Sequence, residues 1–467
     1  MPPEAAPAAL WAPLAWLADG WHDDVLLHIG ADGRWSEITP DVATPPVGAQ
    51  VLASPLLPSL VDTHSHAFQR AFAGAAERRD AATDDFWSWR ERMYAVASRI
   101  APEQLRRVAA QLYVELLRGG YTHVCEFHYL RRDQGGSDYA DPLAMSWALA
   151  DAAADAGIGL TILPVLYERF GFDTPLRENQ RRFRASAEET AAAARRIAAS
   201  GRPLVDAGIA IHSLRAASAE GIETLVALAG DIDGPIHVHV AEQTNEVDEC
   251  LRATGARPIA WLATRGLDAR WQLVHATHAL PGEIDAVAAS GAGVVVCPST
   301  EANLGDGLFD LPRWLAAGVP LSLGSDSHAT RDWREELRLL EYGQRLALRQ
   351  RNVAAAPELG QSSTAERLFA RVLSGSASAT GRVAWGLVCG ARADALLVEP
   401  NDDALLGVEP RRSLDALVFS SPSKPWRDVM VAGQWVLREG RHAGAATIAD
   451  RFAATMTELG DPSLRSG

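Results

Sequence analysis

The stretch Pro55-Leu56-Leu57-Pro58-Ser59-Leu60-Val61-Asp62-Thr63-His64-Ser65-His66 places two histidines directly after a short apolar run. A run of this kind predicts a buried strand over residues 59–62. Side chains alternate between the two faces of a strand, so His64 and His66 should point the same way. One strand end can therefore offer two imidazoles to one metal ion. Taken alone, the pair could equally be two ordinary polar residues at the end of a strand.

Further β-rich runs follow, separated by alanine-rich segments with the apolar spacing of half-buried helices. This alternation is typical of a parallel sheet with helical crossovers. Eight strands predict an α/β fold, a distorted (β/α)8 barrel of the TIM type. The expected strands cover residues 59–62, 123–129, 159–167, 207–212, 235–240, 271–275, 293–297 and 321–325, with helices at 102–117, 142–156 and 185–199.

Both ends of the chain have a different, β-rich texture. Strand-like runs occupy the residues up to about Ala53 without a convincing helix, and similar runs cover residues 387–399, 416–421 and 429–439 before a final helix at 448–459. We expect residues 1–55 and 380–445 to pair into one composite β-domain, residues 56–379 to form the barrel, and residues 446–467 to be a C-terminal helix and tail. Termini that fold separately would show the same pattern.

Composition narrows the class of protein. The 467 residues carry 44 basic and 59 acidic side chains, a net charge of −15, which argues against nucleic acid or an anionic membrane as the main partner. No apolar stretch reaches the roughly 18 residues that a membrane span requires. The start of the sequence lacks the basic and apolar regions of a secretory signal, so we expect a cytoplasmic protein.

The cysteines and the single lysine argue against several kinds of site that depend on thiols or on a lysine. Cys125, Cys250, Cys297 and Cys389 are widely spaced, so neither a disulfide framework nor a thiolate zinc site is indicated, and we expect all four to be buried. Lys424 is the only lysine. Schiff-base catalysis or a lysine-bridged pair of metals would both need this one residue, which lies far from the motifs.

Ionisable residues follow several of the expected strands, where barrel enzymes collect their catalytic groups. Besides His64 and His66 these are His239, Glu242, His275 and Asp326. His275 alone could be an ordinary core histidine, and Asp326 alone could cap a helix. Their joint occurrence in an apolar barrel mouth would be costly without a shared function. Three imidazoles and one carboxylate are a standard ligand set for one divalent ion.

In this order, H-x-H, H-x-x-E, a later histidine and Ser-Asp, the chain resembles the mononuclear deaminase branch of the amidohydrolase superfamily. Ile209-Ala210-Ile211-His212-Ser213 carries no lysine, which agrees with that branch. More narrowly, it resembles the formimidoylglutamate deiminases. The narrower likeness rests on the segments His64–Arg70, Phe86–Arg90, Glu126–Tyr129, His212–Arg215, His239–Gln243 and Thr300–Gly307.

This resemblance implies a barrel with a composite β-sandwich and a set of catalytic roles. His64, His66, His239 and Asp326 would hold one divalent ion, most simply Zn²⁺, and a bound ion lowers the pKa of water from about 15.7 toward about 7. Asp326 and His275 would orient and deprotonate the attacking water, and Glu242 would protonate the leaving nitrogen. His275 could also stabilise the developing charge.

The resemblance further implies a small dianionic substrate, N-formimino-L-glutamate, converted to N-formyl-L-glutamate and ammonia in histidine degradation by a homodimer. Arg90 and Arg215 would bind its carboxylates, because the guanidinium fork matches a carboxylate. Gln69, Tyr129 and His212 would add hydrogen bonds. The rings of Phe86–Trp89 would mainly position Arg90, although they could also stack on a purine. A guanine or S-adenosylhomocysteine deaminase is thus the alternative, followed by a non-catalytic scaffold of the same architecture.

Overall fold

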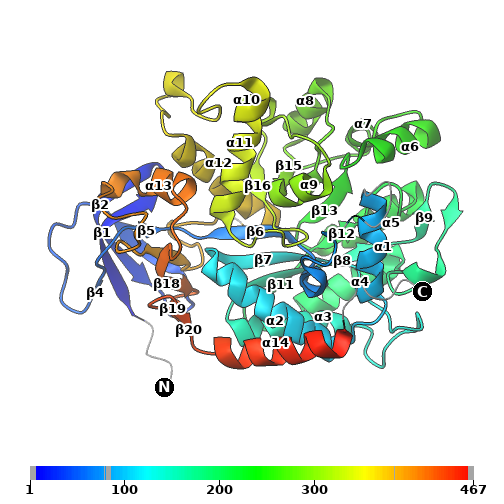
Figure 1. Cartoon of the computed structure of the whole chain (residues 1–467), viewed down its shortest axis with the longest axis horizontal. Coiled ribbons are helices and arrows are strands. Elements are labelled where there is room, and N and C mark those ends of the chain that lie inside the picture. The colour runs from blue at the N-terminus through cyan, green and yellow to red at the C-terminus, as the bar shows by residue number, and fades with distance from the viewer. Residues whose placement is uncertain (1–6, 78, 80–85, 383, 461–467) are drawn as a thin grey trace.

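The protein is described by a computed structural model that covers residues 7–77, 79, 86–382 and 384–460, without the side chain of Trp87. Residues 461–467 of the expected tail therefore lie outside the described residues, as do residues 1–6. Figure 1 shows two parts, a barrel surrounded by helices and a smaller sheet built from both ends of the chain.

Eight parallel strands form the barrel, each paired with its neighbour in chain order. The first and last edges meet at a parallel bridge between Ser65 and Asp326, where the Asp326 amide donates to the carbonyl of His64 at 2.8 Å. The strands are β6 (Leu60–Ser65), β7 (Tyr121–His128), β8 (Gly159–Leu166), β12 (Ile209–Ile211), β13 (Ile236–Val240), β14 (Trp271–His275), β15 (Gly293–Val296) and β16 (Leu321–Leu323), and β11 (Val205–Ala207) pairs with β8. The predicted barrel is confirmed.

Helices with one apolar face cover the outside of the barrel. In α2, the buried residues Leu105, Val108, Leu112 and Leu116 recur at helical spacing against the strands. The helices after β6 are α1 (Phe86–Ala97), α2 (Pro102–Arg118), α3 (Ala144–Ala156), α4 (Ala187–Ala198), α5 (Ala219–Leu228), α6 (Thr244–Thr254), α7 (Pro258–Ala263), α8 (Pro281–Ser290), α9 (Pro298–Leu304), α10 (Leu311–Ala317), α11 (Trp333–Leu348) and α12 (Thr364–Thr380).

The two ends of the chain share one sheet, ordered β20-β19-β18-β17-β5-β1-β2-β3, with β4 beside β1. Its central pairing joins β5 to β17, so the sheet is continuous across the two termini. The strands are β1 (Ala9–Leu17), β2 (Gly20–Ile29), β3 (Trp35–Thr39), β4 (Gln50–Val51), β5 (Leu56–Leu57), β17 (Ala395–Val398), β18 (Trp426–Val431), β19 (Gln434–Arg438) and β20 (Arg441–His442). The composite β-domain is thus confirmed, while the residue boundaries proposed for the domains stay predictions.

Three details of the C-terminal half differ from expectation. Residues 416–421 were expected as a strand, but Ser413–Phe419 form helix α13, because Leu414, Leu417 and Val418 bury one helical face. Of the strand expected at residues 387–399, only Ala395–Val398 form a strand, which is β17. Cys389 is exposed rather than buried, whereas the other three cysteines are buried and all four are free thiols.

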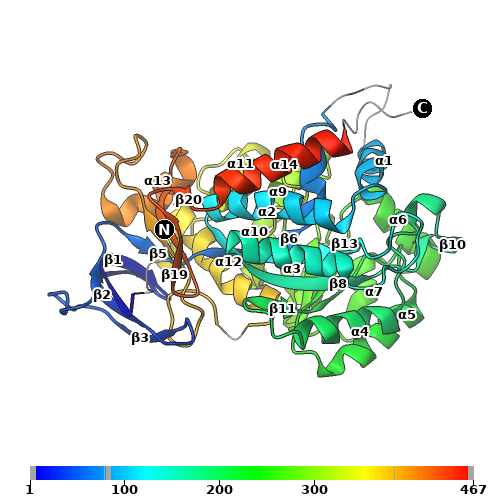
Figure 2. The same ribbon diagram turned by 90° about the horizontal axis from the view of Figure 1, so that it is seen from below.

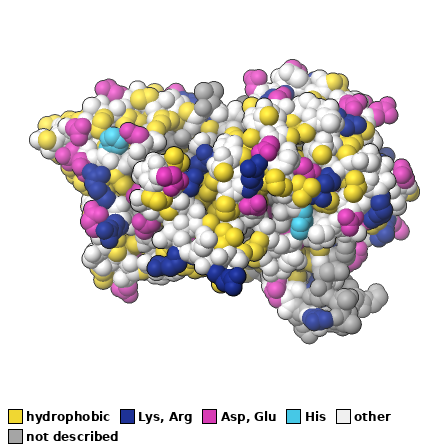
Figure 3. All heavy atoms as spheres, turned by 90° about the horizontal axis from the view of Figure 1, so that it is seen from above, with side chains coloured by type: hydrophobic (Ala, Val, Ile, Leu, Met, Phe, Trp, Pro, Cys, Tyr) yellow, Lys and Arg dark blue, Asp and Glu magenta, His cyan; other side chains and the backbone are white. Residues whose placement is uncertain are grey.

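The last helix of the described residues, α14 (Ala445–Leu459), lies along α2 on the outside of the barrel (Figure 2). Within the described ranges, no helix combines the length and hydrophobicity needed to cross a bilayer. The face drawn in Figure 3 carries acidic and basic side chains interspersed with apolar ones.

Candidate active site

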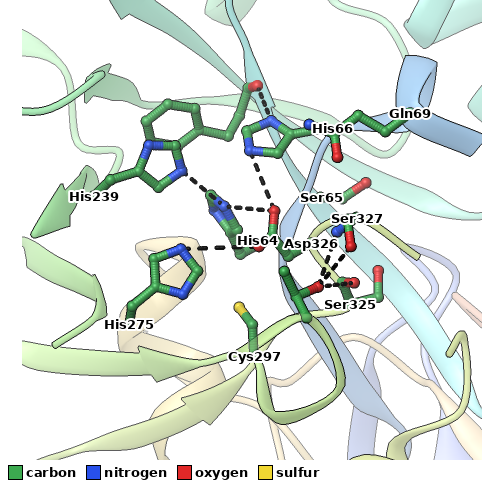
Figure 4. A network of polar contacts seen from close by, with 12 residues as sticks. His64, Ser65, His66, Gln69, His239, His275, Cys297, Ser325, Asp326 and Ser327 are labelled. Atoms are coloured by element: carbon green, nitrogen blue, oxygen red, sulfur yellow. Dashed lines mark hydrogen bonds and ion pairs between the residues drawn. The ribbon is translucent and has the colours of Figure 1, made fainter. Parts of the chain in front are cut away.

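The polar residues predicted at the strand ends meet at one mouth of the barrel (Figure 4). His64 Nε2 lies 3.0 Å from His239 Nε2 and 3.5 Å from Asp326 Oδ1. His66 Nε2 lies 3.4 Å from the same carboxylate oxygen. The four side chains that the sequence nominates as metal ligands therefore point at a common centre.

The protonation of these imidazoles fits a cation at that centre. Burial, together with neighbouring histidines, holds the pKa values of His64 and His239 well below the usual 6.5, so both rings are neutral. Two neutral rings that face each other through Nε2 can share at most one proton. His66 instead pairs its Nδ1 with the Phe127 carbonyl at 2.9 Å, which fixes the tautomer and leaves the Nε2 lone pair directed inward. When a cation replaces the proton between His64 and His239, three nitrogen lone pairs and a carboxylate face it, which matches the ligand chemistry of a divalent ion.

Phe127 also packs against this cluster. Its ring stacks on His239 with centroids 4.2 Å apart, so one residue of β7 orients two ligands, one through its carbonyl and one through its ring.

Backbone strain concentrates at the same place. His275 has φ 70° and Asp326 has φ 48°, in the left-handed region that non-glycine residues avoid. Each such residue costs roughly 1–3 kcal/mol and persists only where its surroundings impose it. At Asp326 the bonds that close the barrel do so, since its amide and carbonyl bind the backbones of His64 and His66. Asp326 caps no helix; the N-cap of α11 is Asp332.

The proposed acid and base residues lie beside the ligands. His275 Nε2 is 3.8 Å from Glu242 Oε1 and 3.8 Å from Asp326 Oδ2. Burial raises the pKa of Glu242 to about 7, against the opposing effect of His275. Burial lowers the pKa of His275, but Glu242, Glu301 and Asp326 outweigh it and raise that pKa to about 10. The protonation states of Glu242 and His275 therefore depend on each other, because the ionised Glu242 carboxylate favours the imidazolium form of His275.

Glu301 is a site residue to which sequence reasoning assigned no role. Its Oε1 accepts the Cys297 amide at 2.9 Å and lies 3.3 Å from His275 Nδ1. A carboxylate at Nδ1 fixes the tautomer of a histidine and directs its Nε2 toward the reaction centre. The sequence held a sign of this role, because Glu301 lies in the first turn of the helix that directly follows barrel strand β15, close to the strand ends where catalytic groups collect.

Glu126 and Asp62 form a second set of buried carboxyls that sequence reasoning missed. Glu126 accepts hydrogen bonds from Ser65 Oγ at 2.8 Å and the Ala67 amide at 2.5 Å, on either side of His66. Burial raises its pKa to about 8. Asp62 accepts from the Ser325 amide and hydroxyl at 2.8 and 2.6 Å, next to Asp326. These carboxyls hold the backbone that carries the ligands.

A cavity opens above these candidate ligands. All five residues predicted to bind substrate line it, namely Gln69, Arg90, Tyr129, His212 and Arg215, together with His66, His239, Glu242, His275 and Asp326. Of the predicted site residues only His64 does not line the cavity; it is fully buried below it. Phe86 and Trp89 also line the cavity, whereas we expected them mainly to pack and position Arg90.

The two arginines enter this cavity from different elements. Arg90, on α1, is 6% exposed and Arg215, after β12, is 8% exposed, so neither is a surface residue. Burial lowers the pKa of Arg90, and the nearby charge of Arg215 adds to this effect. The two guanidiniums are thus close enough to repel each other, which an anion between them would relieve.

The polar side chains of the cavity are also arranged for recognition. Gln69 donates to the Tyr129 hydroxyl at 3.3 Å, and its Oε1 is buried without a hydrogen bond among the described residues. Burial, followed by the charge of Arg215, holds the pKa of His212 well below 6.5, so it is a neutral donor or acceptor.

Comparisons with known proteins agree with this geometry. Residues 56–436 match the model of the amidohydrolase family. The chain is 45% identical over 460 residues to the formimidoylglutamate deiminase of Pseudomonas aeruginosa, covering 97% of this chain and 100% of that one. It is 29% identical over 413 residues to a 5-methylthioadenosine/S-adenosylhomocysteine deaminase of Natronomonas pharaonis, covering 86% of each chain. A solved amidohydrolase structure from Brucella melitensis superposes with a TM-score of 0.91 at 39% identity, covering 97% of this chain and 99% of that one. The chain therefore belongs to the amidohydrolase family.

Proposed function

We propose that the protein hydrolyses N-formimino-L-glutamate to N-formyl-L-glutamate and ammonia. One observation carries the proposal: two buried arginines share a small cavity with a cluster of three histidines and an aspartate. The cluster suits hydrolysis of a C–N bond, and the arginines suit a substrate with two carboxylates. The identity to the Pseudomonas aeruginosa deiminase supports the same substrate.

In this proposal His64, His66, His239 and Asp326 hold one divalent ion, most simply Zn²⁺. Within the described ranges, ligand atoms of His64, His66 and Asp326 lie within 4.8 Å of one another, as do those of His64, His239 and His275. When bound, such an ion makes hydroxide available near neutral pH.

Side chains of the protein accept and donate the protons of this reaction. Water adds its oxygen to the formimino carbon, and the bond from that carbon to the terminal nitrogen breaks to release ammonia. Asp326 accepts one proton of the attacking water, and Glu242, with its raised pKa, donates a proton to the imino nitrogen. When the tetrahedral intermediate collapses, Asp326 passes its proton to the same nitrogen and Glu242 takes up the hydroxyl proton. The two protons added to the departing ammonia are thus balanced by the two of the water, and both carboxyl groups return to their starting states. The carboxylates around His275 favour its protonated form, which supports the charge-stabilising role over that of a free base.

Arg90 and Arg215 bind the two carboxylates of the substrate in this proposal. Gln69 Oε1, which has no hydrogen-bond partner in the part of the chain that the structure describes, and the Tyr129 hydroxyl are available to the formimino group or the backbone nitrogen of the substrate. Guanine would bring no carboxylate to either arginine and S-adenosylhomocysteine would bring only one, so at least one buried arginine would lack an anionic partner from the substrate, which is the physical argument against the nucleobase alternative.

The test is ammonia release by zinc-loaded protein from N-formimino-L-glutamate, with guanine and S-adenosylhomocysteine run alongside. Turnover of the first compound alone is expected. Turnover of a nucleobase alone would retain the metal site but contradict the roles of the arginines. Elemental analysis should give one metal ion per chain, and its absence would favour a non-catalytic scaffold.

The proposal also covers the location and the oligomeric state of the protein. We propose a cytoplasmic homodimer, which light scattering at micromolar concentration and fractionation of the source cells would check. The net charge of −15 supports the expectation that nucleic acid is not a partner.

A further inference from the structure

A small hairpin after barrel strand β8 is interlocked with the turn that carries Arg215. The hairpin consists of β9 (Arg169–Gly171) and β10 (Thr174–Pro175). The Arg169 guanidinium donates to the carbonyls of Leu214, Arg215 and Ala217 at 3.0, 3.2 and 2.9 Å. The amides of residues 168 and 169 both donate to the Ala216 carbonyl. Hairpin and turn therefore form one rigid unit.

Phe170, in the first strand of this hairpin, contacts three arginines. Its carbonyl accepts a hydrogen bond from Arg215 Nη1 at 2.9 Å. Its ring lies 5.2 Å from the Arg90 guanidinium carbon and 3.5 Å from that of Arg177. Arg90, Phe170, Arg177 and Arg215 also line an outer hollow, so the hairpin forms part of the wall next to the arginines of the inner cavity.

Arg90 and Arg215 carry like charges that repel each other, and attractive contacts to each guanidinium offset this repulsion. An aromatic face carries negative charge density and attracts a guanidinium, and a carbonyl oxygen attracts the other. Phe170 supplies both, one to Arg90 and one to Arg215. The same residue therefore contacts both of the proposed carboxylate-binding groups.

We propose that Phe170 is a specificity-determining positioning residue, which sets the spacing of Arg90 and Arg215 so that they bind the two carboxylates of one linear substrate. This inference rests on the proposed function, because it takes Arg90 and Arg215 as the dicarboxylate-binding pair. Phe170 itself touches neither the metal-ligand cluster nor Glu242 in any contact described above.

The test compares the binding of glutarate and butyrate, which differ in one carboxylate, to zinc-loaded wild type and variants by calorimetric titration. Phe170→Leu keeps an apolar side chain and loses the aromatic face, whereas Phe170→Tyr keeps that face. We expect Phe170→Leu to weaken glutarate binding by about tenfold, the size of one or two cation–π contacts. Butyrate binding should change less than threefold, and Phe170→Tyr should bind both like wild type, within about threefold.

The same variants are assayed for KM and kcat with N-formimino-L-glutamate. The expected pattern is a KM raised about tenfold in Phe170→Leu with kcat within about threefold of wild type. Thr174→Ala, at an exposed position of the same hairpin, is the control for general damage to the hairpin and should match wild type. Melting temperatures check folding, and if Phe170→Leu unfolds the protein, Phe170→Met, which is also apolar and not aromatic, replaces it in the comparison with Phe170→Tyr.

Equal loss of glutarate and butyrate binding, or unchanged glutarate affinity in Phe170→Leu, would overturn the inference. Failure of wild type to turn over N-formimino-L-glutamate contradicts the proposed function alone. In that case a selective loss of glutarate binding in Phe170→Leu still supports the role of Phe170.

Discussion

Replacement of Glu301 tests whether the carboxylate behind His275 contributes to the reaction. Glu301 is buried and uses one oxygen for two partners, the Cys297 amide and His275 Nδ1. In Glu301→Gln the amide oxygen can occupy the same position and accept both hydrogen bonds. What the variant loses is the negative charge that favours the imidazolium form of His275 and so helps to raise its pKa to about 10.

The expected size of the effect follows from these contacts. A hydrogen bond to a charged partner contributes about 1.5–3 kcal/mol and a neutral one about 0.5–1.5 kcal/mol, so the loss of charge costs about 1–1.5 kcal/mol. If that energy acts in the transition state, kcat falls about tenfold, since 1.36 kcal/mol corresponds to a factor of ten. Glu301→Ala also leaves two buried donors without an acceptor, and its kcat should fall about a hundredfold or more.

The assay is steady-state ammonia release from N-formimino-L-glutamate, with metal content measured in every variant. The control is Glu341→Gln, because Glu341 is another fully buried carboxylate that accepts two backbone amides, from Val353 and Ala354, but lies away from the cavity lining. We expect its kcat to stay within about twofold of wild type. The reasoning is refuted if both Glu301 variants keep wild-type kcat at full metal occupancy, or if the loss falls entirely on KM.

Three other predictions concern the ligands and their support. Asp326→Asn should abolish measurable turnover, because it removes both a metal ligand and the proton acceptor; a near wild-type rate would contradict the assignment. Arg215→Met should lower kcat/KM by about 10- to 100-fold through loss of a charge-assisted carboxylate contact, and an unchanged ratio would mean that the carboxylate binds elsewhere. Glu126 has a folded pKa of about 8 against an ordinary 4.5, so the folded state holds its proton more tightly than the unfolded state. Its contribution to stability is therefore complete below pH 4.5 and is lost as the pH rises through 8, by up to about 1.4 kcal/mol per pH unit. Glu126→Gln should remove this slope, as urea denaturation at pH 5 and pH 7.5 would reveal; parallel curves for wild type and variant would contradict it.

Much of the barrel could be predicted because its strands are buried on both faces. Runs such as Trp271–His275 and Gly293–Val296 are short, apolar and separated by amphipathic helices, so their positions follow from pattern alone. The residues at the strand ends could be nominated for the same reason, since a barrel brings successive strand ends to one rim. Their convergence on a single centre was then a consequence of the fold.

What the sequence did not predict depends on contacts distant along the chain. Glu126 looks like any polar residue inside a strand until Ser65 and Ala67 are placed against it. The helix at Ser413–Phe419 is a short apolar run whose period cannot be judged over seven residues, and its packing on α11 and α12 decides the structure. The role of Phe170 depends on two arginines that reach it from other elements.

The bridge between Ser65 and Asp326 has a consequence for how this enzyme is made. Next to this bridge, Asp62, two residues before His64, is hydrogen-bonded to Ser325, which directly precedes Asp326. Asp62 and Ser325 are 263 positions apart in the chain. In the ligand set proposed above, a nascent or truncated chain that ends before residue 326 contains His64, His66 and His239 but lacks Asp326. Contacts this distant form late and slowly in folding. Tight capture of the ion should therefore report that the polypeptide has finished folding, and chains cut short before residue 326 should not retain it.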